Sequence, residues 1–376
     1  MRIISKDANI KRILYQKGFD EKDILEFEKE ANSIILRFDN IKNPSEFVQL
    51  LSNMGYFTVS NGPIIFATTS FHNFEKTRCI LAEEGIECSF DADFTISQRY
   101  LLAKDKQISL LKTNVMGIIN VTPDSFYEGS RVQVEKVTQR ALQMIQDGAD
   151  VLDIGGESTR PFSEPVEEEE ELKRVIPAIE AIRDMDKNIP ISIDTYKSRV
   201  AQKAIEAGAD IINDISGGTF DKDMFYVAAQ YNVPIVIMHI KGTPKDMQKN
   251  PYYEDVVEEI LQFFEERIEQ AQKAGVKLEN IILDPGIGFG KRPEDNLEIL
   301  RRCEEFKVLG RPILIGASRK SVIGHVLGNL GPEERLEGTL AISVICVQKR
   351  IEFVRVHDVK ENKRAILMTQ AIFEGV

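Results

Sequence analysis

Polar side chains recur at the carboxyl ends of short apolar runs in the second part of the chain. Carboxylates, amides and imidazoles at such positions could hydrogen-bond a polar ring or move a proton, and hydroxyls could bind an anion. Each of these residues alone could equally cap a helix or satisfy a loop. Their repetition from run to run favours one shared site. They are Asn120, Asp153, Asp194, Asn213, Asp214, His239, Asp284, Ser318 and His357.

Cationic residues follow three of the same runs. Arg160 follows DIGGEST, Arg319 and Lys320 lie in GASRKS, and Arg355 and His357 lie in FVRVH. The SRKS segment is predicted to begin a helix, whose free N–H groups favour an anion. Arg160, Lys320, Arg355 and His357 could therefore converge on a phosphorylated or carboxylated ligand.

Hydrogen-bond acceptors and an aromatic ring complement these cations. Asp194, Asn213 and Asp284 could accept hydrogen bonds from a flat heterocycle of the aminopyrimidinone type. Phe289 in DPGIGFGK can stack on such a ring, and Lys291 adds a charge. No Ser-His-Asp order and no metal-ligand spacing of His or Cys is visible, so covalent catalysis and zinc hydrolysis rank low. The residues predict an enzyme that binds a heterocycle deeply and an anion at the rim.

Eight apolar runs alternate with amphipathic helical stretches from Val115 onward. Because the runs are apolar throughout, they predict parallel strands that are buried on both faces. Eight such units predict a (β/α)8 TIM barrel, in which the C-terminal ends of the strands form the active site. A doubly wound open sheet is the rival architecture. The runs are 115–120, 150–155, 191–194, 210–214, 234–239, 281–286, 312–318 and 353–357.

The N-terminal part has a different pattern, β-α-β-β-α-β, typical of a small ferredoxin-like α+β domain. Its predicted elements are SIILRF, a helix from Asn43 to Met54, FTVS, PIIFATTS, a helix from Phe71 to Glu84, and ECSFDADF. We therefore expect an N-terminal domain of unknown role over residues 1–107 and a barrel over residues 108–376. The segment LLAKDKQISLLKTN is expected to link them.

Composition narrows the class of protein further. The 376 residues carry a net charge of −12, which argues against nucleic-acid and anionic-membrane partners. No apolar run approaches the length that spans a bilayer. The four cysteines form no zinc or CxxC spacing, so we expect reduced, packed thiols in a cytoplasmic protein.

Eight motifs in order resemble the dihydropteroate synthase family: NVTPDSF, DIGGESTRP, IDTYK, INDISGG, MH, DPGIGFGK, SRKS and RVHD. The resemblance covers residues 115–376 and leaves the N-terminal part unassigned. It implies that the chain condenses 6-hydroxymethyl-7,8-dihydropterin diphosphate with 4-aminobenzoate to 7,8-dihydropteroate, with release of diphosphate, in folate biosynthesis. The implied step is dissociative, through a pterin cation. The resemblance also implies Mg²⁺ as a cofactor and a homodimer.

The resemblance assigns roles to individual residues. The implied pterin-binding residues are Asp194, Asn213, Met238, Asp284 and Lys320. The implied diphosphate-binding residues are Asn120, Arg160, Arg355 and His357, and Asn120 also meets the metal. The implied aminobenzoate-binding residues are Phe126, Thr159, Pro161, Phe289 and Ser321. The implied catalytic residues are Asp284, Lys320, Arg160, Arg355 and His357.

The chain also departs from the family pattern. The first loop reads DSFYEGS where the family commonly has DSFSDGG. The sequence therefore does not predict the geometry of this loop or the sulfonamide sensitivity of the protein. The residues concerned are Tyr127, Glu128, Gly129 and Ser130. Phe162 stands where the family often has Gly. Two alternatives stay open: a pterin-binding methyltransferase that serves a corrinoid, and a barrel that binds pterin or acts as a scaffold without catalysis.

Overall fold

The computed structural model divides the chain into two units. The smaller unit contains Met1–Thr95 with the short segments Tyr253–Glu259 and Glu298–Gly310, and the larger unit contains Ile96–Tyr252, Ile260–Leu297 and Arg311–Val376. Among the residues described, no helix is long and apolar enough to cross a membrane. The described residues are 2–4, 14, 17–20, 22–24, 27, 34–38, 43–61, 64–69, 98–121, 131–159 and 163–374.

The N-terminal unit contains a four-stranded antiparallel sheet in the order β1-β2-β4-β3. Strands β2 (Ile34–Phe38) and β3 (Phe57–Asn61) are joined through helix α3 (Pro44–Asn53), and β4 (Ile64–Thr69) lies between them. This is the split β-α-β arrangement that the sequence predicts. Strand β1 (Arg2–Ile4) was not predicted. The predicted helix 71–84 and the strand after it lie outside the described residues.

The larger unit is a closed barrel of parallel strands, as predicted. Its sheet runs β12-β11-β10-β9-β8-β7-β14-β13, and a parallel bridge between Leu283 and Ile313 closes the ring. An open doubly wound sheet is thereby excluded. The strands are β7 (Asn114–Asn120), β8 (Val151–Gly155), β9 (Ile191–Asp194), β10 (Ile211–Asp214), β11 (Ile235–Met238), β12 (Ile281–Asp284), β13 (Leu314–Ile315) and β14 (Phe353–Val356).

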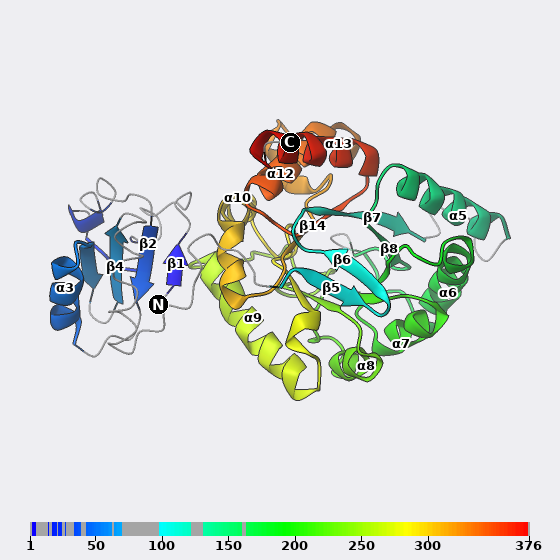
Figure 1. The fold of residues 1–376 in the computed structure, drawn as a ribbon, viewed down its shortest axis with the longest axis horizontal. Helices are drawn as coiled ribbons and strands as arrows, with labels where there is room; N and C mark the ends of the chain where they lie inside the picture. Colours follow the sequence, from blue (N-terminus) through cyan, green and yellow to red (C-terminus); the bar gives the residue numbers. More distant parts are fainter. Residues whose placement is uncertain are drawn as a thin grey trace. The chain divides into compact units, whose positions relative to one another are not determined.

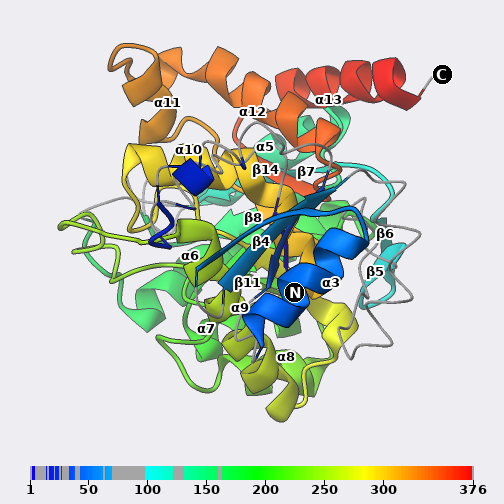
Figure 2. The ribbon, with the colours of Figure 1, turned by 90° about the vertical axis from the view of Figure 1, so that its left-hand side faces the viewer.

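Helices surround the strands (Figure 1). The predicted amphipathic stretches form helices, and the acidic run EEEE becomes the first turn of α6, where carboxylates favour the positive end of the helix dipole. Helices α12 and α13 pack side by side (Figure 2). The helices are α5 (Arg131–Gln146), α6 (Glu168–Met185), α7 (Ser198–Ala207), α8 (Met224–Tyr231), α9 (Val256–Lys273), α10 (Pro293–Arg302), α11 (Ser321–Val326), α12 (Leu336–Gln348) and α13 (Val359–Glu374).

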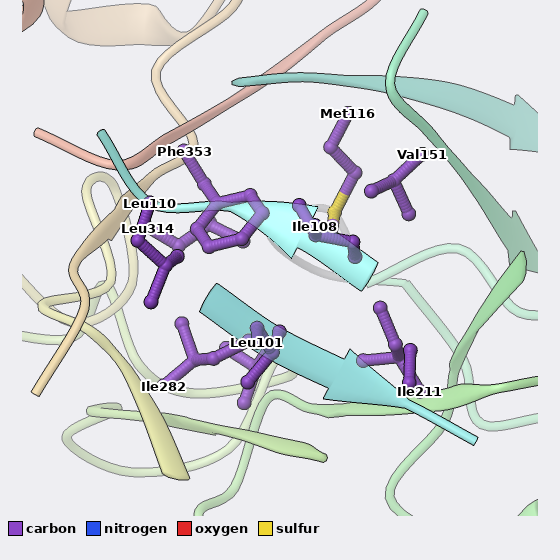
Figure 3. Packing of buried hydrophobic residues seen from close by; sticks show 11 residues of the cluster. Leu101, Ile108, Leu110, Met116, Val151, Ile211, Ile282, Leu314 and Phe353 are labelled. Atoms are coloured by element: carbon purple, nitrogen blue, oxygen red, sulfur yellow. The ribbon is translucent and has the colours of Figure 1, made fainter. Parts of the chain in front are cut away.

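A hairpin of β5 (Tyr100–Ala103) and β6 (Lys106–Ser109) lies at the N-terminal end of the barrel. Its buried side chains pack against the first residues of the barrel strands (Figure 3). The hairpin side chains are Leu101, Ala103, Ile108 and Leu110. We expected this segment to link two units and placed the boundary at residues 107/108. In the structure that boundary follows the hairpin loop, inside β6, and the hairpin belongs to the barrel unit.

Candidate active site at the C-terminal end of the barrel

Strand register brings the predicted polar residues to one end of the barrel. Asp194, the last residue of β9, pairs with Gly155 of β8 on one side and with Asn213 of β10 on the other. Asp284, the last residue of β12, pairs with Met238 of β11. All of these positions are C-terminal ends of parallel strands, so their side chains share one mouth.

The floor of this mouth is built around Arg355 on β14. Its Nε donates to Asp153 Oδ2 at 2.6 Å, and its Nη2 donates to Asp194 Oδ2 at 2.5 Å. Asn213 Nδ2 donates to the same Asp153 oxygen at 3.2 Å. Burial disfavours the guanidinium charge, but the two aspartates outweigh that cost and raise the pKa of Arg355. Four strands are therefore connected by one buried network.

Asp194 has an unusual carboxyl group. Burial raises its pKa to about 7, because the attraction of Arg355 only partly offsets the loss of solvent and nearby Asp153 opposes ionisation. Its Oδ1 atom is buried and has no hydrogen-bond partner among the residues that the structure describes. A buried acceptor without a partner is costly, so this oxygen is suited to a ligand that carries N–H donors.

Asp284 and Lys320 form the opposite part of the mouth. Asp284 Oδ1 accepts from the backbone N–H of Gly286 at 2.8 Å, and burial raises the pKa of its carboxyl. Lys320 Nζ donates to the carbonyl oxygen of Ile287 at 2.5 Å and lies 4.5 Å from the ring centroid of Phe289. Burial lowers the pKa of Lys320 to about 8. The attraction between the ammonium of Lys320 and the face of the Phe289 ring stabilises this contact and helps to fix the position of the cation.

An apolar wall adjoins these charges. Buried side chains from the ends of β10 and β11 and from the loop after β12 pack together, and Tyr196 packs against them. Such a surface can cover a flat ring while the carboxylates bind its edge. The members of the wall are Ile215, Met238, Ile240, Met247 and Phe289.

His357 lies at the rim, directly after β14. Its Nδ1 is 3.0 Å from Ser318 Oγ, and its backbone N–H donates to the same hydroxyl at 3.2 Å. Arg140 on α5 donates to the backbone oxygen of His357 at 3.0 Å. These bonds fix the imidazole at the end of the strand, so its ring nitrogens have a defined direction.

Three residues expected at the mouth have other positions or partners. Arg319 does not add a second cation beside Lys320, because its guanidinium forms two 2.8 Å bonds to Asp358. Lys291 is buried, its Nζ lies 2.9 Å from His239 Nδ1, and it donates to the carbonyl oxygen of Phe289 at 3.0 Å. It holds the loop together and offers no rim charge.

Asp214 is likewise a structural residue. Its carboxylate accepts from the backbone N–H groups of Ser216 at 2.8 Å and Gly218 at 2.6 Å. Burial raises its pKa to about 6 in spite of these bonds. The carboxylate shapes the turn after β10.

Of the predicted aminobenzoate-binding residues, Thr159 is half-buried in the loop after β8, Phe289 belongs to the apolar wall, and Ser321 is exposed at the start of α11. Ser321 lines a pocket of about 330 Å³ together with residues of α10 and α11. Phe126, Arg160 and Pro161 lie outside the described residues.

Asn120 ends β7 beside Asp194. The position that a Cβ atom would take on Gly155 lies 3.7 Å from Asn120 Oδ1 and 3.5 Å from Asp194 Oδ2. The two oxygens therefore border the same space above Gly155, which the absence of a side chain keeps open.

Sequence reasoning missed the contacts of four residues at this end of the barrel. Asp153 was counted at the rim but not recognised as a partner of Arg355. Glu157, Tyr196 and Lys197 form a buried polar cluster at the base of the loop after β8. Two residues in the sequence could have indicated this cluster: Glu157 in GGES and Lys197 in IDTYK. A charged residue within an otherwise apolar or small-residue segment needs a partner.

The fold and site define a TIM-barrel enzyme with acceptors for a polar ring at the floor and cations beside them. Residues 116–357 match the family described as pterin binding enzyme. A relative from Clostridium beijerinckii named dihydropteroate synthase is 54% identical over 263 residues, which are 69% of this chain and 94% of the relative. The chain belongs to the dihydropteroate synthase family of pterin-binding enzymes.

Solved structures agree with this assignment. The dihydropteroate synthase of Xanthomonas albilineans with 4-aminobenzoic acid is 40% identical, covers 74% of this chain and 100% of its own, and has a TM-score of 0.69. The same enzyme in complex with 7,8-dihydropteroate is 36% identical with the same coverage and a TM-score of 0.66. The predicted fold and the predicted enzyme class, a transferase of folate biosynthesis, are confirmed.

Proposed function

We propose that this barrel mouth condenses 6-hydroxymethyl-7,8-dihydropterin diphosphate with 4-aminobenzoate, releasing diphosphate. The observation that carries the proposal is Asp194 Oδ1, a buried carboxylate oxygen without a partner in the described part of the chain, in a mouth that also contains a second buried acid, Asp284. A pterin presents adjacent N–H and NH₂ donors, which two carboxylates and an amide can accept.

The pterin would lie at the floor. Asp194 and Asp284 accept from the ring donors, and Asn213 adds its amide oxygen while its nitrogen is bound to Asp153. Lys320 donates to a ring acceptor from its place beside Phe289. Met238 contributes apolar cover. This arrangement fixes the ring by its edge and leaves the exocyclic methylene toward the rim.

The diphosphate would lie at the rim. Arg355 uses Nε and Nη2 for the two aspartates, so its Nη1 is the atom offered to the anion. His357 adds a ring N–H, and Arg160 adds a cation from the loop after β8. Fixed donors at the place where negative charge develops lower the barrier to departure of the leaving group.

The Mg²⁺ implied by the family would meet Asn120 and the diphosphate. The described residues contain no cluster of three or more metal-binding side chains. Mg²⁺ commonly takes only one or two protein oxygens and completes its shell with phosphate oxygens and water, so the oxygen of Asn120 fits as such a ligand. When bound, the ion would neutralise charge on the leaving diphosphate.

The 4-aminobenzoate would lie over the pterin methylene. Thr159 and Ser321 offer polar contacts, and Phe289 offers a ring face. The family resemblance adds Phe126 and Pro161, which lie outside the described residues. In the reaction the C–O bond to diphosphate breaks with its electron pair on oxygen. The aniline nitrogen then attacks the methylene cation and loses its proton. Carboxylates at the edge of the electron-rich ring stabilise that cation.

We infer further that the enzyme is a cytoplasmic homodimer. Cys303 and Cys346 are buried, and packed thiols suit a reducing compartment. Helix α12 carries no charged residue after Glu337, and four large apolar side chains on α13 are more than half exposed. Apolar surface on this scale favours a second copy of the chain as its partner. The four are Leu367, Met368, Ile372 and Phe373.

One assay tests the proposed reaction. The purified chain is incubated with the pterin diphosphate, 4-aminobenzoate and Mg²⁺, and dihydropteroate and diphosphate are measured together. Equal amounts of both products are expected. A requirement for a corrinoid would instead support a methyltransferase, and pterin binding without turnover would support a binding protein.

A further inference from the structure

The loop that follows β8 is fixed to helix α6 at its first residues. Arg174 Nη1 on α6 donates to the carbonyl oxygen of Gly156 at 2.9 Å. A Cβ atom on Gly156 would come within 2.7 Å of Val175 Cγ1, so the backbone packs on the helix more closely than any side chain allows. The path of the chain toward Thr159 therefore begins from a defined place.

The next residue, Glu157, is the centre of a buried polar cluster that also contains Glu171, Tyr196 and Lys197. Lys197 Nζ lies 2.6 Å from Glu157 Oε2 and 2.5 Å from Glu171 Oε2. Tyr196 donates its hydroxyl to Glu157 Oε1 at 2.9 Å. One ammonium thus joins the loop after β8, the loop after β9 and helix α6.

This polar cluster is costly for stability alone. Two buried carboxylates share one ammonium, and burial raises the pKa of Glu171 even with Lys197 beside it. The desolvation penalty of buried ion pairs commonly cancels their attraction, while their directional bonds can specify one geometry. We therefore expect this cluster to fix the orientation of the loop after β8 rather than to stabilise the fold.

The cluster is also connected to the ligand site. The ring of Tyr196 packs against the apolar wall that contains Met238 and Phe289. It makes an edge contact with Phe220, with the ring centroids 5.5 Å apart. Lys197 and Glu171 are occupied with each other and with Glu157, so they act through the loop.

We propose that Lys197 is a positioning residue, which holds the loop after β8 so that Thr159 meets the aminobenzoate. This inference rests on the proposed placement of that ligand. Loss of the ammonium would leave Glu157 and Glu171 to repel one another, and the loop would depart from α6. The pterin floor, which is held at the strand ends by the bonds of Arg355 to Asp153 and Asp194, would keep its geometry.

The test replaces Lys197 with Met in the full chain and measures both KM values. The KM for 4-aminobenzoate is expected to rise roughly tenfold, because small displacements of positioning groups are costly, while the KM for the pterin diphosphate changes far less. Amide hydrogen exchange of residues 156–159 in the ligand-free protein should become faster. Lys197→Arg should restore much of the loss. Lys203→Met, on the exposed face of α7, which begins directly after Lys197, is the matched control.

The following outcomes test the positioning role of Lys197. Equal changes in both KM values, or unchanged exchange at residues 156–159, would overturn the positioning role. If Lys197→Met does not fold, Tyr196→Phe removes a single bond to Glu157 and should shift the same KM in the same direction, and no shift would count against the proposal. Thr159→Val distinguishes an error in the proposed ligand placement from an error in the proposed loop positioning. If it leaves the aminobenzoate KM unchanged while Lys197→Met raises it, the ligand placement is wrong and the loop positioning stands.

Discussion

Arg355 Nη2 lies 2.5 Å from Asp194 Oδ2, although the two residues are 161 positions apart in the sequence. The same guanidinium reaches Asp153 through Nε. Three strands thereby share one planar group whose fork matches two separate carboxylates. The site needs this arrangement because an unpaired charge at the barrel floor would be costly. The pairing also leaves one nitrogen of Arg355 for an anion.

Arg355→Lys is expected to lower kcat/KM by at least about tenfold, because a single ammonium cannot replace the planar fork that bonds Asp153 and Asp194. The unpaired carboxylate should also lower the melting temperature. Steady-state kinetics and thermal unfolding measure the two effects. Arg199→Lys, at an exposed ion pair with Glu168 on the barrel surface, is the control and should change neither. Normal kinetics for Arg355→Lys would contradict the proposed role.

Pterin binding is expected to weaken as the pH falls below about 7. Burial raises the pKa of Asp194 from 3.8 to about 7, so the free protein holds this proton through the range in which an ordinary aspartate is ionised. The proposed acceptor must then lose its proton to bind the ring. Calorimetry in buffers of different ionisation enthalpy should record proton release on pterin binding near neutral pH.

Asp194→Asn is the matched variant for that experiment. It cannot ionise, so its weaker pterin binding should lose the pH dependence. The same linkage affects stability: a raised carboxyl pKa stabilises the folded state at low pH, and this contribution is lost as the pH rises through about 7. Pterin affinity that is independent of pH in the unchanged protein would contradict the assignment of Asp194.

Much of this site follows from the sequence, because a barrel strand delivers its last residue to a known end. Asp194, Asn213 and Asp284 could be assigned to one mouth once eight apolar runs were recognised. The direction of a side chain in a loop could not be predicted in this way. Arg319 has a left-handed backbone with φ of 56°, and its side chain pairs with Asp358 while that of Lys320 lies beside Phe289.

The packing of the β5–β6 hairpin at the N-terminal end of the barrel could not be predicted from the sequence either. The buried Leu101, Ala103, Ile108 and Leu110 lie at every second position of their strands, as in a half-buried hairpin, but the exposed Leu102 and Leu111 are also apolar and obscure the alternation. The turn between the strands uses Lys104 with φ of 56°, and lysine gives no sequence signal for that conformation. The hairpin was therefore interpreted as a linker.

Activity is expected to fall as the pH rises above about 8, because burial lowers the pKa of Lys320 to that value. Loss of the proton removes the cation beside Phe289 and one donor to the pterin. A pH profile of kcat/KM should show this alkaline limb. Lys320→Arg keeps its charge at high pH and should flatten the limb, at some cost in rate. A profile of Lys320→Arg with the same alkaline limb would assign the limb to another group.

Charged substitutions on α13 are expected to give a monomer. Leu367 and Phe373 are 53% and 62% exposed on a helix that packs beside α12, which carries no charged residue after Glu337. Burying these side chains against a second copy removes apolar area from water, and a glutamate there would have to be buried without a partner. Light scattering of Leu367→Glu/Phe373→Glu should show half the mass of the unchanged protein. Leu142→Glu on α5, another exposed leucine, is the control and should remain dimeric. A monomer for the unchanged protein would remove the proposed interface.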